Sequence, residues 1–199
     1  MRYTRKSIAR RLKVPYAGGY RMSNVFLTGA INIGKSTIVS RVMAEFLRTG
    51  ISTAGFYTLP YVIGGAVKGY YIHPLFPMEL LPLPEKRIIG TIKGDQWAGV
   101  TQTFESIGTE ILEQSLAGTA DLVIMDELGF FEEKAFGFQD RVVELLDSPK
   151  TVLGVIKPSN LPFLNDIRKR DDVWLLEVTR ANRSHLAGRV LEGLRGNGI

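Results

Sequence analysis

The stretch Gly29-Ala30-Ile31-Asn32-Ile33-Gly34-Lys35-Ser36-Thr37 decides the fold class of this chain. It fits the pattern G-x-x-x-x-G-K-[ST], a glycine-rich turn whose backbone N–H groups surround a polyphosphate. In such loops the lysine reaches the β- and γ-phosphates, and the hydroxyl that follows it is a ligand of Mg²⁺. We therefore expect these nine residues to bind a nucleotide, with Lys35 also in a catalytic role and Ser36 on the metal.

The residues on either side of this loop support the interpretation. Val25–Thr28 is a short apolar run, which predicts a buried strand before the loop. After the loop, apolar residues recur at the spacing of an amphipathic helix, and Gly50 ends the pattern: Ile38, Val39, Val42, Met43, Phe46 and Leu47. A helix that begins at the loop places its partial positive charge beside the phosphates.

Length and composition indicate a soluble globular protein. The 199 residues are 45% hydrophobic and 23% charged, enough for one domain of ordinary size with a substantial core. The longest apolar runs, such as Leu122–Met125, are far too short to span a bilayer, so we expect no membrane contact from the part of the chain after residue 21. The absence of cysteine excludes disulfides and thiolate metal sites and agrees with a cytoplasmic location.

The positive charge of the chain is concentrated at its beginning. Residues 1–21 contain seven lysine and arginine residues, and the first acidic residue is Glu45. The rest of the chain holds 18 of the 25 basic residues and all 20 acidic ones. We interpret residues 1–21 as a basic, solvated leader that the predicted nucleotide site does not require. Binding of nucleic acid is not expected of the body, and the leader is the only candidate for contact with RNA, a membrane surface or a targeting receptor.

Beyond the loop, short apolar runs alternate with helical patterns. We expect strands at 53–58, 61–63, 69–73, 87–92, 121–125, 151–156 and 173–178, and helices at 101–117, 136–146, 161–170 and 182–194. This alternation predicts an α/β fold with a mostly parallel sheet covered by helices on both faces. Gly64-Gly65 predicts a β-hairpin inserted after the second strand. The expected architecture is a single P-loop NTPase domain of the RecA/ASCE-like type over residues 22–199.

A second part of the site is predicted at Asp126 and Glu127. They follow the apolar run Leu122–Met125, at the carboxyl edge where open α/β sheets bind ligands. In P-loop NTPases an aspartate at this point holds Mg²⁺, and a glutamate directly after it can orient the attacking water. We therefore assign Asp126 to the metal and Glu127 to catalysis; an ordinary acidic loop is the alternative.

Arginines follow the last predicted strand. Arg180 and Arg183 lie just past residues 173–178, so they too belong to the ligand edge of the sheet. We include both among the candidate nucleotide-binding residues, for contact with phosphate or base. The neighbouring Asn182 is a candidate cap for the final helix. We interpret Arg168, Lys169 and Arg170 as a solvated helix end. The alternative is an arginine among them that stabilises charge on the transferred phosphoryl group.

At this point the chain resembles the thermophilic-type nucleoside-triphosphatase family. The resemblance covers roughly residues 24–192. Besides the phosphate loop, it is carried by these segments: Gly55-Phe56-Tyr57-Thr58, Met125-Asp126-Glu127-Leu128-Gly129-Phe130-Phe131-Glu132, Val152-Leu153-Gly154-Val155-Ile156, Pro162-Phe163 and Thr179-Arg180-Ala181-Asn182-Arg183. It implies hydrolysis of several nucleoside triphosphates to diphosphates, with Mg²⁺ as cofactor and broad tolerance of the base.

The chain departs from the family pattern in three segments. Asn32 stands where a glycine is common, and Ile31 lies near a usual proline. Asparagine tolerates positive φ better than other non-glycine residues, so the loop can still form. Phe130-Phe131 precedes the glutamate where another residue is usual, and Lys157 takes the place of a histidine or other polar residue after the fifth strand. These changes bear on rate and base preference more than on nucleotide binding.

The sequence thus predicts a Mg²⁺-dependent nucleoside-triphosphatase. Two alternatives stay open. A nucleotide or nucleoside kinase would use the same loop but transfer the phosphoryl group to an acceptor. A nucleotide-dependent switch or binding protein would turn over slowly until a partner accelerated it.

Overall fold

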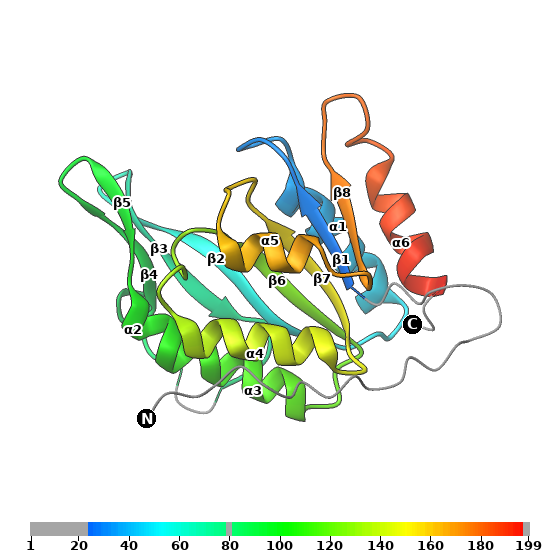
Figure 1. Ribbon diagram of the computed structural model, residues 1–199, viewed down its shortest axis with the longest axis horizontal. Coiled ribbons are helices and arrows are strands. Elements are labelled where there is room, and N and C mark those ends of the chain that lie inside the picture. Colours follow the sequence, from blue (N-terminus) through cyan, green and yellow to red (C-terminus); the bar gives the residue numbers. More distant parts are fainter. Residues whose placement is uncertain (1–23, 79–80, 197–199) are drawn as a thin grey trace.

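The computed structural model describes residues 24–78 and 81–196 (Figure 1). The predicted basic leader, residues 1–21, lies outside the described residues. Within them, one eight-stranded sheet has the order β5-β4-β3-β2-β6-β7-β1-β8. The strands are β1 (Asn24–Thr28), β2 (Thr53–Ile63), β3 (Ala66–Pro74), β4 (Ile88–Lys93), β5 (Gln96–Gly99), β6 (Leu122–Leu128), β7 (Thr151–Ile156) and β8 (Val173–Glu177).

The sheet has a parallel part and an antiparallel part. Strands β2, β6, β7, β1 and β8 pair in parallel, whereas β3, β4 and β5 extend the β2 edge as antiparallel strands. The parallel strands are continuous apolar runs because both of their faces are covered; all six residues of β7 are buried. The antiparallel strands reach away from the rest of the molecule, at the left in Figure 1.

Helices cover both faces of the parallel part. They are α1 (Lys35–Arg48), α2 (Thr101–Thr103), α3 (Thr109–Ala117), α4 (Phe136–Asp147), α5 (Pro162–Arg168) and α6 (Leu186–Gly196), with a π-helical turn at Phe104–Gly108 between α2 and α3 and a 3₁₀ turn at Pro84–Lys86. One core packs α1 and α6 against the sheet, and the other packs α3, α4 and α5 against the opposite face. Within residues 24–78 and 81–196, no helix is both long and apolar enough to cross a membrane.

This architecture confirms the predicted α/β fold with a mostly parallel sheet and helices on both faces. Strand β7 has the predicted bounds, since an uninterrupted apolar run between Pro149 and Pro158 leaves little choice. The second strand differs: β2 continues without a break through Pro60 to Ile63 and forms the antiparallel hairpin with β3 directly. Pro60 lies beyond Tyr57, the last residue of β2 that pairs with β6, so its missing N–H costs no bond to β6.

Three other elements differ from the sequence prediction. Strand β5 was not predicted. Strand β6 runs to Leu128, so Asp126 and Glu127 lie within the strand, where the β6–β7 register shifts between Met125 and Leu128. The last helix begins at Leu186 rather than Asn182, because residues 180–185 form turns.

Candidate active site

The phosphate loop connects β1 to α1 and has a left-handed backbone at three points. Gly29, Asn32 and Gly34 have φ angles of 135°, 58° and 112°. A Cβ at Gly29 would lie 2.6 Å from the carbonyl oxygen of Val178, so this position requires glycine for space as well as for conformation. Asn32 adopts the left-handed conformation expected of it. Gly34 is the N-cap residue of α1.

Lys35 is folded back over the loop. Its Nζ donates to the carbonyl oxygens of Gly29 (2.9 Å) and Ala30 (2.8 Å), and only 8% of the residue is exposed. Burial lowers the pKa of Lys35, the carboxylates of Glu127 and Asp126 raise it, and the charge of Lys157 lowers it again. Lys35 is therefore a buried cation whose hydrogen bonds can be exchanged for those of a phosphate.

Ser36, in the first turn of α1, lies beside Asp126 of β6. Ser36 Oγ donates to Asp126 Oδ1 at 3.4 Å. Asp126 is 5% exposed, and burial raises its pKa to about 6 despite the hydrogen bond from Ser36 and the charge of Lys35. Two oxygen donors at this separation, one of them a carboxylate, are a donor set suited to a hard divalent cation.

Glu127 forms an ion pair with Lys157, the first residue after β7. Glu127 Oε1 lies 2.8 Å from Lys157 Nζ, and both side chains are about three-quarters buried. The backbone N–H of Glu127 donates to Thr58 Oγ1 at 3.3 Å. The adjacent strands β6 and β7 thus bring together two residues that are 30 positions apart in the sequence.

The segment Gly55–Thr58, one of those that carry the family resemblance, supports the acidic pair from β2. A Cβ at Gly55 would lie 1.9 Å from the carbonyl oxygen of Ile124, so glycine is required where β2 approaches β6. Tyr57 pairs with Asp126 in the sheet, and Thr58 holds the backbone of Glu127 as described above. This segment therefore positions the backbone of Asp126 and Glu127.

The loop that follows β6 packs against the side chain of Lys157. A Cβ at Gly129 would lie 2.8 Å from Lys157 Cδ, and Lys157 Nζ lies 5.0 and 5.2 Å from the ring centroids of Phe130 and Phe131. Glu132 closes this loop, because its carboxylate accepts a hydrogen bond from the backbone N–H of Gly129. Glu132 is 1% exposed, and burial raises its pKa to about 7.

Arg180 and Arg183 are exposed on the turn after β8. The turn is anchored to the phosphate loop, since Val178 N donates to Thr28 O at 2.8 Å and Val178 O contacts Gly29. Asn182 shapes the turn, because its Oδ1 accepts from Thr179 N and its Nδ2 donates to Glu177 O, both at 2.8 Å. Asn182 therefore caps this turn rather than the final helix, and both arginines stay candidates for nucleotide contact.

Arg168 has a role different from the one considered for it. Its guanidinium donates to Ser159 O (3.0 Å), to Asn165 Oδ1 (2.8 Å) and to the carbonyl oxygen of Lys157. These bonds hold the chain between β7 and α5, and they position Lys157 rather than a phosphoryl group.

The structure thus brings the phosphate loop, Asp126 and Glu127 together at one edge of the sheet, with Arg180 and Arg183 on the adjoining turn. Sequence reasoning noted Lys157 only as a departure from the family pattern, without its partner Glu127, and assigned no role to Glu132. The signal for Lys157 was its place directly after β7, which lies between β6 and β1 in the sheet. For Glu132 it was a carboxylate directly after two phenylalanines.

The chain is similar to known proteins over most of its length. The sequence profile of the NTPase family matches residues 24–191. The chain is 29% identical over 173 residues to nucleoside-triphosphatase THEP1 of Thermotoga maritima, covering 87% of this chain and 96% of that protein. It is 32% identical over 171 residues to THEP1 of Methanopyrus kandleri (85% and 93% covered), and 29% identical over 177 residues to the human cancer-related nucleoside-triphosphatase (82% and 92% covered).

Solved structures show the same fold. The solution structure of a human cancer-related nucleoside triphosphatase superposes with a TM-score of 0.66 at 26% identity, over 87% of this chain and 97% of that one. The crystal structure of THEP1 from Aquifex aeolicus superposes with a TM-score of 0.65 at 23% identity, over 86% and 98%. The resemblance inferred from the sequence is confirmed, and this chain belongs to the NTPase family.

Proposed function

We propose that this chain hydrolyses nucleoside triphosphates to diphosphates and phosphate with Mg²⁺ as cofactor. The observation that carries the proposal is the meeting of two lysines and two carboxylates, Lys35, Asp126, Glu127 and Lys157, beside a phosphate-binding loop. The names of the relatives, nucleoside-triphosphatases from bacteria, archaea and mammals, support the same reaction.

The triphosphate would bind across the loop from Gly29 to Thr37. Backbone N–H groups and the amino terminus of α1 would hold its oxygens. Lys35 would exchange the carbonyls of Gly29 and Ala30 for the β- and γ-phosphates, so that a buried cation gains anionic partners. Thr37, which is exposed on the first turn of α1, would donate to the α-phosphate.

The donor set of the site fits Mg²⁺. Ser36 Oγ and Asp126 Oδ1 are oxygen donors 3.4 Å apart, and the phosphates would add further oxygens. The buried carboxylate of Asp126 gains from a cation beside it, because burial in the free protein disfavours its charged form. When bound, Mg²⁺ would neutralise charge on the phosphates.

Glu127 is our candidate for orienting and deprotonating the attacking water. A general base must lie within hydrogen-bond reach of that water and keep a fixed orientation. Thr58 fixes the backbone of Glu127, and Lys157 fixes its carboxylate. The γ-phosphate, an anion, would compete with Glu127 for the ammonium group of Lys157.

We expect broad tolerance of the base. Each role assigned above acts on the triphosphate, which all common nucleotides share. Arg180 and Arg183 are the residues that we propose for contact with the remainder of the nucleotide, because their turn adjoins Gly29.

The test is phosphate release from ATP, GTP, CTP and UTP, with Mg²⁺ or with EDTA, and with or without nucleoside and nucleotide acceptors. We expect Mg²⁺-dependent release from all four, and loss of most of it in Lys35→Ala with the fold retained. Phosphoryl transfer that exceeds hydrolysis would replace our proposal with a kinase. Hydrolysis at the parent rate in a folded Lys35→Ala protein would exclude this site.

A further inference from the structure

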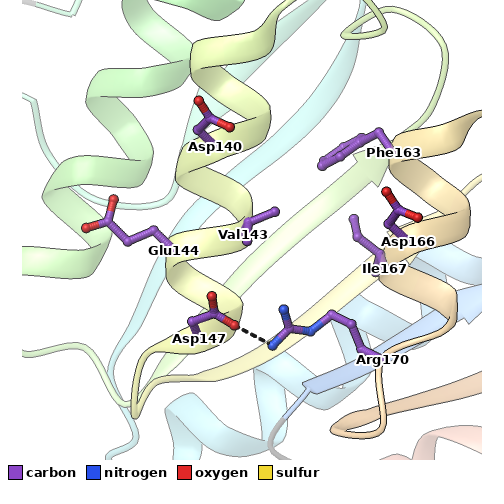
Figure 2. A pocket seen from close by; sticks show the side chains of 8 residues that line it. All are labelled: Asp140, Val143, Glu144, Asp147, Phe163, Asp166, Ile167 and Arg170. Atoms are coloured by element: carbon purple, nitrogen blue, oxygen red, sulfur yellow. Dashed lines mark hydrogen bonds and ion pairs between the residues drawn. The ribbon is translucent and has the colours of Figure 1, made fainter. Parts of the chain in front are cut away.

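A groove of about 560 Å³ runs between α4 and α5, on the face of the sheet opposite α1 and α6. Figure 2 shows Val143 on α4 and the pair Phe163 and Ile167 on α5 pointing toward one another across it. Ile167 is buried and belongs to the core below, whereas Val143 and Phe163 are partly exposed. The groove therefore has an apolar floor that solvent reaches.

Carboxylates line the rim of this groove. Asp140, Glu144 and Asp147 recur on α4 at the spacing of one helical side, and Asp166 stands on α5. Among the lining residues that the structure describes, Arg170 is the only cation, and its guanidinium lies 2.7 Å from Asp147 and 2.7 Å from Asp172. Among the contacts of residues 24–78 and 81–196, Asp140 and Asp166 have no cationic partner. A segment that combines cations with apolar side chains would complement this surface.

The start of β1 lies at one end of the same groove. Asn24, the first described residue, donates through Nδ2 to Leu146 O and to Asp172 Oδ2, both at 3.2 Å. Arg170 donates to the same Leu146 oxygen at 3.3 Å. The chain before Asn24 therefore departs beside the Asp147–Arg170 end of the groove.

We infer that the basic leader, residues 1–21, binds in the α4–α5 groove of its own chain. The leader carries seven cations without a carboxylate, interspersed with Ile8, Leu12 and Val14. An extended segment of this length reaches ~70 Å, far more than the ~18 Å of the 12-residue helix α4. Attachment at Asn24 also gives the leader a high effective concentration at the groove, so weak contacts are sufficient for occupancy.

This binding leaves the candidate active site free. The leader joins the amino end of β1, whereas the phosphate loop follows the carboxyl end, about 17 Å away along a five-residue strand. We therefore expect occupancy of the groove to leave hydrolysis unchanged. The inference stands on the groove and the charge pattern, and it does not depend on the proposed function.

The absence of cysteine from the chain permits a direct test on the full-length protein. A nitroxide on Ser7→Cys, the single thiol, should broaden the amide NMR signals of α4 and α5 at least fivefold more than those of α6. Because the contacts are partly ionic, the broadening should fall severalfold at about 0.5 M salt. As a control, spin-labelled chain without ¹⁵N is mixed with ¹⁵N-enriched chain that carries no nitroxide. The signals of the enriched chain should then show no broadening.

Matched variants assign the effect to the groove. Asp140→Asn with Asp166→Asn should reduce the broadening at least fivefold, whereas Asp95→Asn with Glu192→Gln, exposed residues on other elements, should retain it. The amide spectra of both pairs, without the nitroxide, should keep the dispersion of the parent spectrum, which shows that they fold. Uniform broadening, or broadening that survives the groove substitutions, would overturn the inference. Broadening between separate chains would instead make a second copy's leader the occupant.

Discussion

Lys157 Nζ lies 2.8 Å from Glu127 Oε1, and this pair joins the acidic end of β6 to the first residue after β7. Gly129 leaves space for the lysine stem, two phenylalanine rings lie beneath its ammonium group, and Arg168 holds its carbonyl oxygen. So many contacts on one side chain indicate a fixed position. Lys157 also acts electrostatically on Lys35, so the two cations share one site.

We predict that Lys157→Met lowers kcat by roughly 10–10³-fold and changes KM much less. The substitution removes a preorganised cation beside the transferred phosphoryl group and frees the carboxylate of Glu127 to move. Steady-state hydrolysis of ATP measures both constants. Lys169→Met, an exposed lysine at the end of α5, is the control and should behave as the parent. Faster turnover in Lys157→Met would mean that the ion pair restrains the reaction.

A second prediction concerns Glu127. Glu127→Gln keeps the shape of the side chain but loses its basicity, so nucleotide affinity should be retained while kcat falls roughly 10²–10⁴-fold. Single-turnover hydrolysis and equilibrium binding of ATP separate the two effects. Hydrolysis at the parent rate would show that Glu127 is not the base and would favour a kinase or a switch.

A third prediction distinguishes Asp126 from its neighbour. Asp126→Asn removes the negative charge beside Ser36, so half-maximal activity should require roughly 10–100-fold more Mg²⁺, and nucleotide binding should weaken with it. A titration of Mg²⁺ at fixed ATP measures the shift. Asp95→Asn, an exposed carboxylate in the β4–β5 turn, should leave the titration unchanged. An unaltered Mg²⁺ requirement in Asp126→Asn would remove Asp126 from the metal site.

Local patterns predicted the parts of the fold that local physics determines. The phosphate loop is a contiguous motif, and β7 is a buried apolar run between two prolines, so neither needed knowledge of the rest of the chain. The left-handed backbone of Asn32 likewise follows from the residue itself. The four residues of β5 were missed because Gln96–Gly99 is short and half-exposed. Its pairing with β4 is what makes it a strand.

The contacts of the site depend on the order of the strands. Glu127 and Lys157 meet because β6 and β7 are neighbours, and the sequence places α4 between them without stating that adjacency. The same holds for Thr58, which reaches Glu127 because β2 lies on the other side of β6. Candidate residues could therefore be named one by one from their motifs, but the partner of each could not.

The last prediction concerns Glu132 and the pH dependence of stability. Burial raises the pKa of Glu132 from its ordinary value of 4.5 to about 7, although the N–H of Gly129 and the charge of Lys157 lower it. Below pH 4.5 the folded and unfolded states both hold the proton, and the group does not affect stability. Between pH 4.5 and about 7 the unfolded chain has lost the proton and the folded chain keeps it, so the free energy of unfolding falls as pH rises. Above about pH 7 this loss of stability is constant.

Glu132→Gln keeps an oxygen that can accept a hydrogen bond from the N–H of Gly129, but it cannot titrate. Its stability should therefore lack this dependence on pH. The free energy of unfolding of the parent, relative to Glu132→Gln, should therefore fall by about 1–3 kcal/mol between pH 4.5 and 7.5 in urea denaturation. Glu133→Gln, its exposed neighbour, should follow the parent at every pH. Parallel curves for the parent and Glu132→Gln would show that the buried carboxyl keeps an ordinary pKa.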